Sequence, residues 1–255
     1  MAQEAARTLE GYVALVTGGP RNIGRAMALA FAEQGASVVI TAVNDMASAK
    51  SAVKDIEARG VAGLAVKCDV TKEEDVAALH EAVKARFGRL DVLVNNAAVR
   101  HEQVFGEMTY AQWRYVVGVT LDGAFLTATA MLPLLKASGR GAIVNIGGMS
   151  AYTGAKKRVH VLAAKSGLGG LTRGLAHDLA EHGITANLVS PGLIDTVRGG
   201  HSAKEPDHHK HHATLLGRRG RPEEVADMVV WLAGPHGRYV TGQTIHVNGG
   251  AYLPT

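Results

Sequence analysis

The stretch "YVALVTGGPRNIG", residues 12–24, is the strongest indication of the fold in this sequence. An apolar, β-branched run enters a glycine-rich turn, and the helical pattern "RAMALAFAEQG" follows at once. As the first strand, turn and helix of a parallel sheet, this order presents backbone amides and the positive end of a helix dipole to a diphosphate. The stretch therefore predicts a dinucleotide site at the start of the chain.

The rest of the chain continues the alternation of strand and helix. Buried strands are expected at 12–16, 37–41, 63–67, 91–95, 142–146, 185–190 and 244–248. Helical patterns between them end at Gly35, Gly60, Gly88 and Gly234. Parallel strands need right-handed crossovers, so we expect a single α/β domain over residues 1–255 with a doubly wound, seven-stranded parallel sheet of the Rossmann type.

Composition excludes several classes of protein. The net charge of +4 is spread over interspersed acids and bases, which argues against nucleic acid as the main partner. The single cysteine, Cys68, excludes an internal disulfide. No secretory signal and no apolar window of about 20 residues are visible, so we expect a cytoplasmic protein without a membrane partner.

Five segments stand in a telling order: "TGGPRNIG" (17–24), "CDV" (68–70), "NNAA" (95–98), "SPGLIDT" (190–196) and "VTGQTIHVNGG" (240–250). Together they resemble the motifs of the short-chain dehydrogenase/reductase family over nearly the whole chain. The resemblance implies cofactor contacts at Thr17, Gly18, Gly19, Arg21, Asn22, Ile23, Gly24, Asp69, Val70, Asn95, Ala97, Lys165, Pro191, Gly192, Ile194 and Thr196. Asn22 replaces the middle glycine of the turn, and Asn tolerates positive φ better than most residues.

The choice of nicotinamide cofactor depends on the end of the second strand. A carboxylate there would hold the ribose hydroxyls of NAD, but the position is Ala42. Asp45, a little further on, is interpreted as a helix N-cap. Arg21 lies where NADP-dependent members of the resembling family carry a basic residue. NADP(H) is therefore favoured, with NAD(H) as the alternative.

The catalytic residues depart from the family's pattern. The family uses a Ser, a Tyr, a Lys four residues after the Tyr, and an Asn. Lys165 matches the Lys, but the Tyr position is Val161, the Ser position is Gly148 and the Asn position is Thr120. The resemblance therefore implies a non-standard active site.

Neighbouring loops offer replacements for the missing acid. Ser150 and Tyr152 follow the strand over 142–146, where loops at strand ends carry the chemistry of such sheets. Tyr152 is the preferred substitute. Arg100 and His101 lie on another loop that borders the cleft.

The helix before Lys165 offers two further candidates. His160 lies about 140° around the helix from Lys165, so it should point elsewhere unless the first turn is irregular. Arg158 returns to the face of Lys165 if the helix extends that far.

The segment "HSAKEPDHHKHH", residues 201–212, falls in the family's substrate lid, here about 197–216. No metal site is expected from its histidines. With Lys210, Arg218 and Arg219 they favour an anionic small-molecule substrate.

Three functional interpretations remain open. The first is an NADP(H)-dependent oxidoreductase that transfers hydride to or from a small carbonyl or alcohol, with a relocated proton donor. The second is a reductase of conjugated C=C or C=N bonds, similar to dienoyl-CoA reductases, and the third is a nucleotide-binding pseudoenzyme or partner subunit. The segments 125–135, 160–181 and 242–253 match the family's subunit contacts, which implies a homotetramer or a homodimer.

Overall fold

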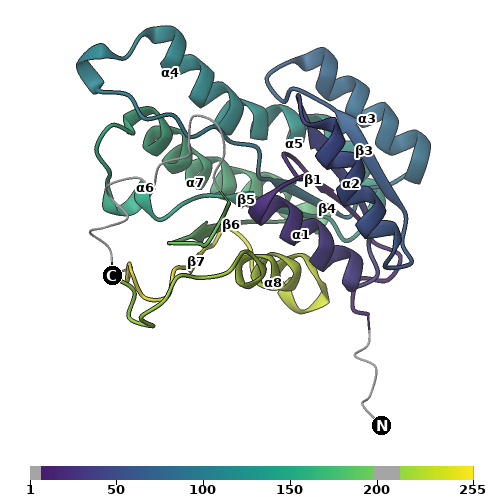
Figure 1. Ribbon diagram of the computed structural model, residues 1–255. Helices are drawn as coiled ribbons and strands as arrows, with labels where there is room; N and C mark the ends of the chain where they lie inside the picture. Colours follow the sequence, from purple (N-terminus) through teal and green to yellow (C-terminus); the bar gives the residue numbers. More distant parts are fainter. Residues whose placement is uncertain (1–6, 198–212, 255) are drawn as a thin grey trace.

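The computed structural model describes residues 7–197 and 213–254 (Figure 1). Within these ranges the chain forms one parallel seven-stranded sheet in the order β3-β2-β1-β4-β5-β6-β7. The strands are β1 Val13–Val16, β2 Ser37–Ala42, β3 Gly63–Lys67, β4 Val92–Asn95, β5 Ala142–Ile146, β6 Thr185–Pro191 and β7 Thr244–Val247. The expected doubly wound sheet is confirmed, and the expected strand ends agree to within one residue.

Helices fill the crossovers between the strands. The α-helices are α1 Asn22–Glu33, α2 Met46–Glu57, α3 Glu73–Phe87, α4 Tyr110–Val117, α5 Gly123–Ser138, α6 Ser150–Thr153, α7 Val159–Leu179 and α8 Pro222–Ala233. Short 3₁₀ turns are η1 Phe105–Glu107, η3 Ala180–His182 and η6 Pro235–Gly237, and a π-helical turn, η2 Gly118–Asp122, joins α4 to α5.

Two hydrophobic cores cover the two faces of the sheet. Side chains of a strand alternate between faces, so in β1 Ala14 and Val16 join the core under α1, α2 and α8, while Val13 and Leu15 join the core under α3, α5 and α7. Figure 1 shows α1 and α8 side by side on one face. This two-sided burial explains why the strands read as continuous apolar runs.

The order of strands reverses between β1 and β4. The two neighbouring crossovers therefore leave in opposite directions, and a crevice opens at the carboxyl ends of these strands. The glycine-rich turn after β1 lies at this point.

One helical run is long and apolar enough to cross a membrane, although no such segment was expected from the sequence. This run, Tyr110–Ser138, has a mean hydropathy of 1.5 over its most apolar window. Half of that window, however, is buried inside the fold. Its apolar side chains, among them Met131 and Leu135, pack into the core under the sheet. The excess of apolar residues thus has a structural explanation in the core.

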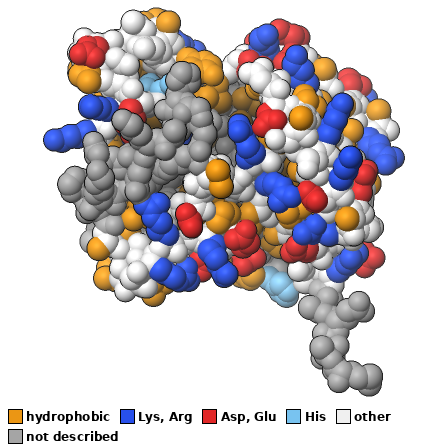
Figure 2. Space-filling model, viewed as in Figure 1, with side chains coloured by type: hydrophobic (Ala, Val, Ile, Leu, Met, Phe, Trp, Pro, Cys, Tyr) orange, Lys and Arg blue, Asp and Glu red, His pale blue; other side chains and the backbone are white. Residues whose placement is uncertain are grey.

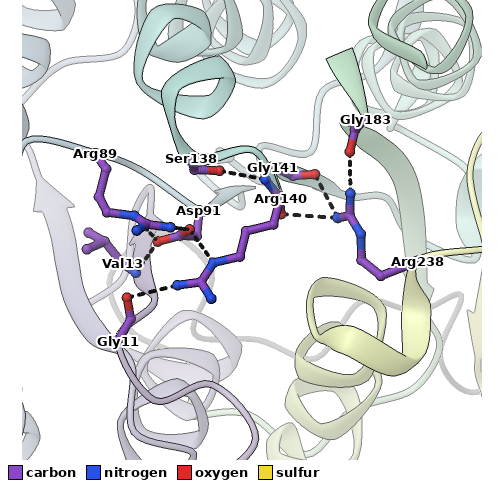
Figure 3. Close-up of polar contacts among 9 residues, drawn as sticks. All are labelled: Gly11, Val13, Arg89, Asp91, Ser138, Arg140, Gly141, Gly183 and Arg238. Carbon is purple, nitrogen blue, oxygen red and sulfur yellow. Dashed lines mark hydrogen bonds and ion pairs between the residues drawn. The ribbon is translucent and has the colours of Figure 1, made fainter. Parts of the chain in front are cut away.

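A buried carboxylate holds the opposite, amino-terminal edge of the sheet (Figure 3). Asp91 directly precedes β4 and is 0% exposed. It accepts hydrogen bonds from Val13 N at 2.8 Å and Arg140 Nε at 2.9 Å, and it also pairs with Arg89. The carboxylate therefore ties the first residue of β1 to the chain before β4 and β5.

Two arginines extend this cluster. Arg140 donates to Gly11 O at 3.1 Å and lies over the ring of Tyr12, 3.8 Å from its centroid. Arg238 donates to the carbonyls of Arg140 and Gly141 at 3.1 Å and 3.0 Å, and to that of Gly183. Backbone groups at the starts of β1, β5 and β6 thereby find their hydrogen-bond partners in one cluster of side chains.

The surface carries both signs of charge. On the face shown in Figure 2, Lys and Arg side chains are interspersed with Asp and Glu, and no continuous area of one sign covers it. This pattern agrees with the small net charge of +4.

Candidate active site

The glycine-rich turn after β1 is shaped for close approach of a ligand. Gly18 has a φ of +63°, and a Cβ on Gly24 would lie 2.7 Å from Gly18 O. Asn22 adopts a φ of 50°, so it takes the positive φ expected of it. Within the described residues the N-cap of α1, Arg21, supplies no side-chain hydrogen bond to the first helical turn. That helix end is therefore open to an anion.

Thr17 and Asn96 bind this turn to the end of β4. Thr17 Oγ1 accepts hydrogen bonds from Asn96 N at 3.0 Å and Ala97 N at 3.1 Å. Asn96 Nδ2 donates to Thr17 O at 2.9 Å and Gly18 O at 3.0 Å. Sequence reasoning missed Asn96, although it stands beside Asn95 in the quoted "NNAA" segment.

The side chain of Asn95 makes its polar contacts inside the fold. Its side chain is buried, donates to Asn145 Oδ1 at 2.9 Å and accepts from Thr127 Oγ1 at 2.7 Å. Asn95 thus points into the core because adjacent residues of a strand face opposite sides of the sheet.

Asp69 and Val70 follow β3 and lie outside the pocket described next. Asp69 Oδ1 accepts from Thr71 N at 3.0 Å and Thr71 Oγ1 at 2.7 Å. Val70 is buried, and a Cβ added to Gly123 would lie 2.6 Å from it. The structure therefore uses both residues in local packing and turn formation.

A pocket opens at the carboxyl ends of β4, β5 and β6 and reaches the first turns of α7. Of the expected cofactor residues, Ile23, Lys165, Pro191, Gly192, Ile194 and Thr196 line it. Asn22 Nδ2 donates to Val197 O at 3.0 Å, which connects the glycine turn to the segment after Thr196. Residues far apart in the sequence are thus brought to one cavity.

Lys165 lies in this pocket with its Nζ donating to Ile146 O at 2.5 Å. Burial, and then the nearby charge of Arg100, lower the pKa of Lys165 to about 7. Its ammonium therefore gives up a proton far more easily than an exposed lysine does.

Val161 lines the same pocket one helical turn before Lys165. Gly148 lines it as well, and a Cβ there would meet nothing within 4 Å. Thr120 is buried in the π-helical turn η2. Val161 therefore places no phenol in the pocket, and Gly148 places no hydroxyl there.

Comparison with known proteins identifies the family of this chain. A family model described as "Enoyl-(Acyl carrier protein) reductase" matches residues 18–252. A Serratia marcescens short-chain dehydrogenase/reductase variant superposes with a TM-score of 0.87 at 31% identity, over 96% of this chain and 99% of that one. The chain belongs to the short-chain dehydrogenase/reductase family.

The names of two further relatives state an activity or a bound cofactor. The chain is 35% identical over 240 residues to 3-oxoacyl-[acyl-carrier-protein] reductase FabG of Staphylococcus aureus, covering 94% of this chain and 98% of that protein. It is 32% identical, with a TM-score of 0.87, to a short-chain dehydrogenase from Burkholderia cenocepacia solved in complex with NADP, over 96% of this chain and 99% of that one.

Within this family fold, the structure does not bring Tyr152 to Lys165. Ser150 begins α6 and lines the pocket, whereas Tyr152 contacts the rings of His246 and Tyr252 at centroid distances of 4.7 Å and 5.6 Å. Residues two apart on a helix point about 200° apart, so only one of the pair can face the pocket. In this structure Ser150, and not Tyr152, lines the pocket with Lys165.

The two histidine candidates also lie outside the pocket lining. His160 is 0% exposed, neither ring nitrogen has a hydrogen-bond partner among the described residues, and burial lowers its pKa. His101 is exposed, and its ring centroid lies 5.9 Å from that of Tyr115.

Arg100 and Arg158 line the pocket together with Lys165. Arg158 is the N-cap residue of α7, only 7% exposed, and its Nε lies 3.3 Å from Glu102 Oε1. Arg100 is exposed at the end of the loop after β4. These arginines join the pocket because the loop after β4 and the start of α7 meet at its mouth.

At the other end of the crevice, Arg21 faces Asp45. Arg21 Nε lies 3.5 Å from Asp45 Oδ2, and Asp45 Oδ1 accepts a hydrogen bond from Ser48 N at 3.1 Å. The bonds from Ser48, and then the charge of Arg21, lower the pKa of Asp45. The N-cap interpretation of Asp45 is confirmed, and Ala42 ends β2 without a carboxylate.

Most of the lid segment, residues 198–212, lies outside the described residues, and so does the His-rich stretch 201–212. Arg218, expected to favour an anionic substrate, pairs instead with Glu224 through contacts of 2.9 Å and 2.6 Å. That pairing lowers the pKa of Glu224 to about 2. Across residues 7–197 and 213–254, no three His, Cys, Asp or Glu side chains gather in a group that could hold a metal ion.

Proposed function

We propose that this chain is an NADP(H)-dependent oxidoreductase that transfers hydride to or from a small carbonyl or alcohol substrate, with Lys165 as its proton donor and acceptor. The observation that carries the proposal is the shared pocket of Lys165, Val161 and Gly148. In that pocket the lysine is present while the phenol and hydroxyl of the family's pattern are not. The complex of the Burkholderia relative with NADP supports the choice of cofactor.

The residues of the crevice fit a dinucleotide. The turn is tightly packed, since a Cβ on Gly24 would lie 2.8 Å from Asn96 Nδ2 and one on Gly18 would lie 3.1 Å from Ala97 Cα. The open helix end of α1 would receive the diphosphate, and Thr196 and Ile194 would border the nicotinamide. When bound, the cofactor supplies or accepts the hydride.

Lys165 is the best proton donor among the polar groups of the pocket. Arg100 and Arg158 stay protonated at any ordinary pH, and the hydroxyl of Ser150 is a weak acid. A group with a pKa of about 7 suits proton transfer near neutrality. In reduction the Nζ–H bond breaks as the proton passes to the substrate oxygen, which leaves a neutral amine that water reprotonates. In oxidation the same amine takes the proton from the alcohol.

Reduction of a conjugated C=C bond is the second candidate. The matching family model is described as an enoyl reductase, and delivery of hydride to carbon relaxes the need for a phenol at position 161. The names of the FabG relatives support a 3-oxo compound instead. The third candidate, a nucleotide-binding subunit without turnover, requires the pocket of Lys165 to bind no substrate.

One experiment separates these candidates. NADPH consumption is measured against ketones, including 3-oxoacyl thioesters, and against enones and imines, while NADPH affinity is measured by calorimetry. We expect turnover with ketones. Turnover restricted to enones or imines would select the second candidate, and tight NADPH binding without any turnover would select the third.

The cofactor preference gives the first prediction. NADPH is expected to bind at least about tenfold more tightly than NADH, which requires only about 1.4 kcal/mol. The ion pair of Arg21 with Asp45 is exposed and therefore weak, so a 2′-phosphate can take the place of the carboxylate. Arg21→Ala should remove the preference. Asp45→Asn, which retains an N-cap side chain, should strengthen it, and equal affinities in the wild type would contradict the assignment.

The oligomeric state gives the second prediction. We propose a homotetramer, because large apolar side chains are exposed on two of the segments that match the family's subunit contacts: Phe125 at 54% in 125–135 and Leu253 at 66% in 242–253. Packing these side chains against a second copy of the chain would remove their apolar surface from water. Light scattering at micromolar concentration should give a mass near four chains of 26.7 kDa. A monomer under these conditions would refute the proposal.

A further inference from the structure

Lys165 is held in the pocket by a neutral group. Its Nζ donates to the carbonyl oxygen of Ile146, the last residue of β5, at 2.5 Å. Among the described residues that line the pocket there is no Asp or Glu to stabilise an ammonium. Burial, and then the charge of Arg100, lower the pKa of Lys165 to about 7. At pH 7 a large share of this side chain is therefore a neutral amine, which can direct one N–H to Ile146 and still offers a lone pair.

The space beside this amine is open to a small molecule. Lys165 is only partly buried, and it lines the pocket together with Val161 and Gly148. Val161 lies four residues before Lys165 on the same face of α7 and has a short apolar side chain. A Cβ added to Gly148, two residues after Ile146, would meet nothing within 4 Å. A carbonyl compound can therefore enter the pocket without displacing a bulky side chain at either position.

We propose that Lys165 is also a covalent site for small aldehydes and ketones, with its neutral amine as the nucleophile. The nitrogen forms a bond to the carbonyl carbon, and the carbonyl oxygen leaves as water with the two hydrogens of the amine. A Schiff base remains, nothing is oxidised or reduced, and hydrolysis reverses the step. When protonated, the imine has one N–H, which can again donate to Ile146 O.

The surroundings of Lys165 suit this chemistry. Lysine acts as a nucleophile toward carbonyl compounds where a desolvated pocket or a neighbouring cation keeps its amine unprotonated. Lys165 has both, since it is enclosed in the pocket and Arg100 lines the same cavity. The step needs no nicotinamide, so the inference goes beyond the proposed function.

The test traps the Schiff base by reduction. The full-length protein without nicotinamide is treated with propanal and sodium cyanoborohydride at pH 7, so that the reagent converts the imine into a stable propylated lysine. Peptide mass spectrometry measures the rate at each lysine, with Lys54, exposed on α2, as the reference. We expect Lys165 to react at least about tenfold faster, because an exposed lysine is neutral in only roughly one molecule in three thousand at pH 7.

The advantage of Lys165 should depend on pH. The ratio of its labelling rate to that of Lys54 cancels the pH dependence of the reagents. This ratio should fall at least about tenfold between pH 7 and pH 10, because Lys54 becomes neutral over that interval whereas Lys165 is already neutral. A ratio that stays constant with pH would overturn the proposal.

Two substitutions at one position test the role of the open space. Val161→Phe should slow labelling of Lys165 at least about fivefold, because the ring fills the approach to the amine. Val161→Ala should leave it as fast as in the wild type, and neither change should affect Lys54. The proposal is overturned if Lys165 in the wild type reacts no faster than Lys54, or if both substitutions slow its labelling alike in proteins that circular dichroism shows to be folded.

A separate measurement of NADPH consumption distinguishes this inference from the proposed function. Selective trapping at Lys165 in a protein that consumes no NADPH would support the covalent site and remove the oxidoreductase. Turnover of ketones without selective trapping would overturn this inference and leave Lys165 as a proton donor only.

Discussion

Lys165→Met is expected to lower the rate of NADPH-dependent carbonyl reduction by at least about a thousandfold in a protein that stays folded. Loss of one general acid typically costs about a hundred- to ten-thousandfold. In this pocket Val161 and Gly148 offer no second donor to share the task. Steady-state rates and circular dichroism of the variant provide the measurement.

Two controls distinguish this mechanism from the alternatives. Tyr152→Phe should retain full activity, because the ring packs on His246 and Tyr252 rather than facing Lys165. Ser150→Ala should cost less than about tenfold if the hydroxyl only orients the substrate. A Tyr152→Phe variant as inactive as Lys165→Met would mean that the tyrosine moves into the pocket during turnover, and that Lys165 is not the acid.

The pH dependence follows from the same lysine. Its pKa in the fold, about 7, lies below the ordinary value of 10.5. Reduction needs the ammonium, so its rate should fall as pH rises through the pKa, and oxidation should rise over the same interval. Because the unfolded chain binds more protons between pH 7 and 10.5, the lysine makes stability increase with pH across that window. Lys165→Met should remove this slope in thermal unfolding of the cofactor-free protein.

Asp91→Ala is expected to lower the free energy of unfolding by roughly 3–5 kcal/mol, the usual cost of removing one partner from a buried ion pair. The change leaves Val13 N without its acceptor and leaves two guanidiniums, those of Arg89 and Arg140, without their shared carboxylate (Figure 3). Asp91 is 0% exposed, so water cannot replace these contacts without opening the edge of the sheet. Denaturant unfolding measures the loss.

A smaller change in the same cluster is the control. Arg89 is 37% exposed, and without it Asp91 still accepts hydrogen bonds from Val13 N and Arg140 Nε. Arg89→Ala should therefore lower the free energy of unfolding by about 1 kcal/mol or less. If Asp91→Ala cost no more than Arg89→Ala, the cluster would be a surface feature with no role in holding β1 to β4. Activity per folded molecule should be unchanged in both variants, since the cluster lies at the far edge of the sheet from the pocket.

The architecture follows largely from the sequence. Strand and helix periods are local, and alternating β and α elements permit few topologies, so the sheet and its strand ends could be predicted closely. The turn at Gly18 and Gly24 is also local, since a few consecutive residues set its backbone. The spacing of four residues between Val161 and Lys165 places both on one helical face whatever surrounds the helix.

Which side chains come together depends on tertiary packing. Asn96 rather than Asn95 reaches the glycine turn, and Ser150 rather than Tyr152 faces the pocket, because the orientation of each strand and short helix depends on what packs beside it. Arg100 and Arg158, 58 positions apart in the sequence, line one pocket because of the path of two loops, which no period encodes. Local periodicity shows which side chains share one face of a helix or strand. The site depends instead on how packing brings the faces of distant elements together.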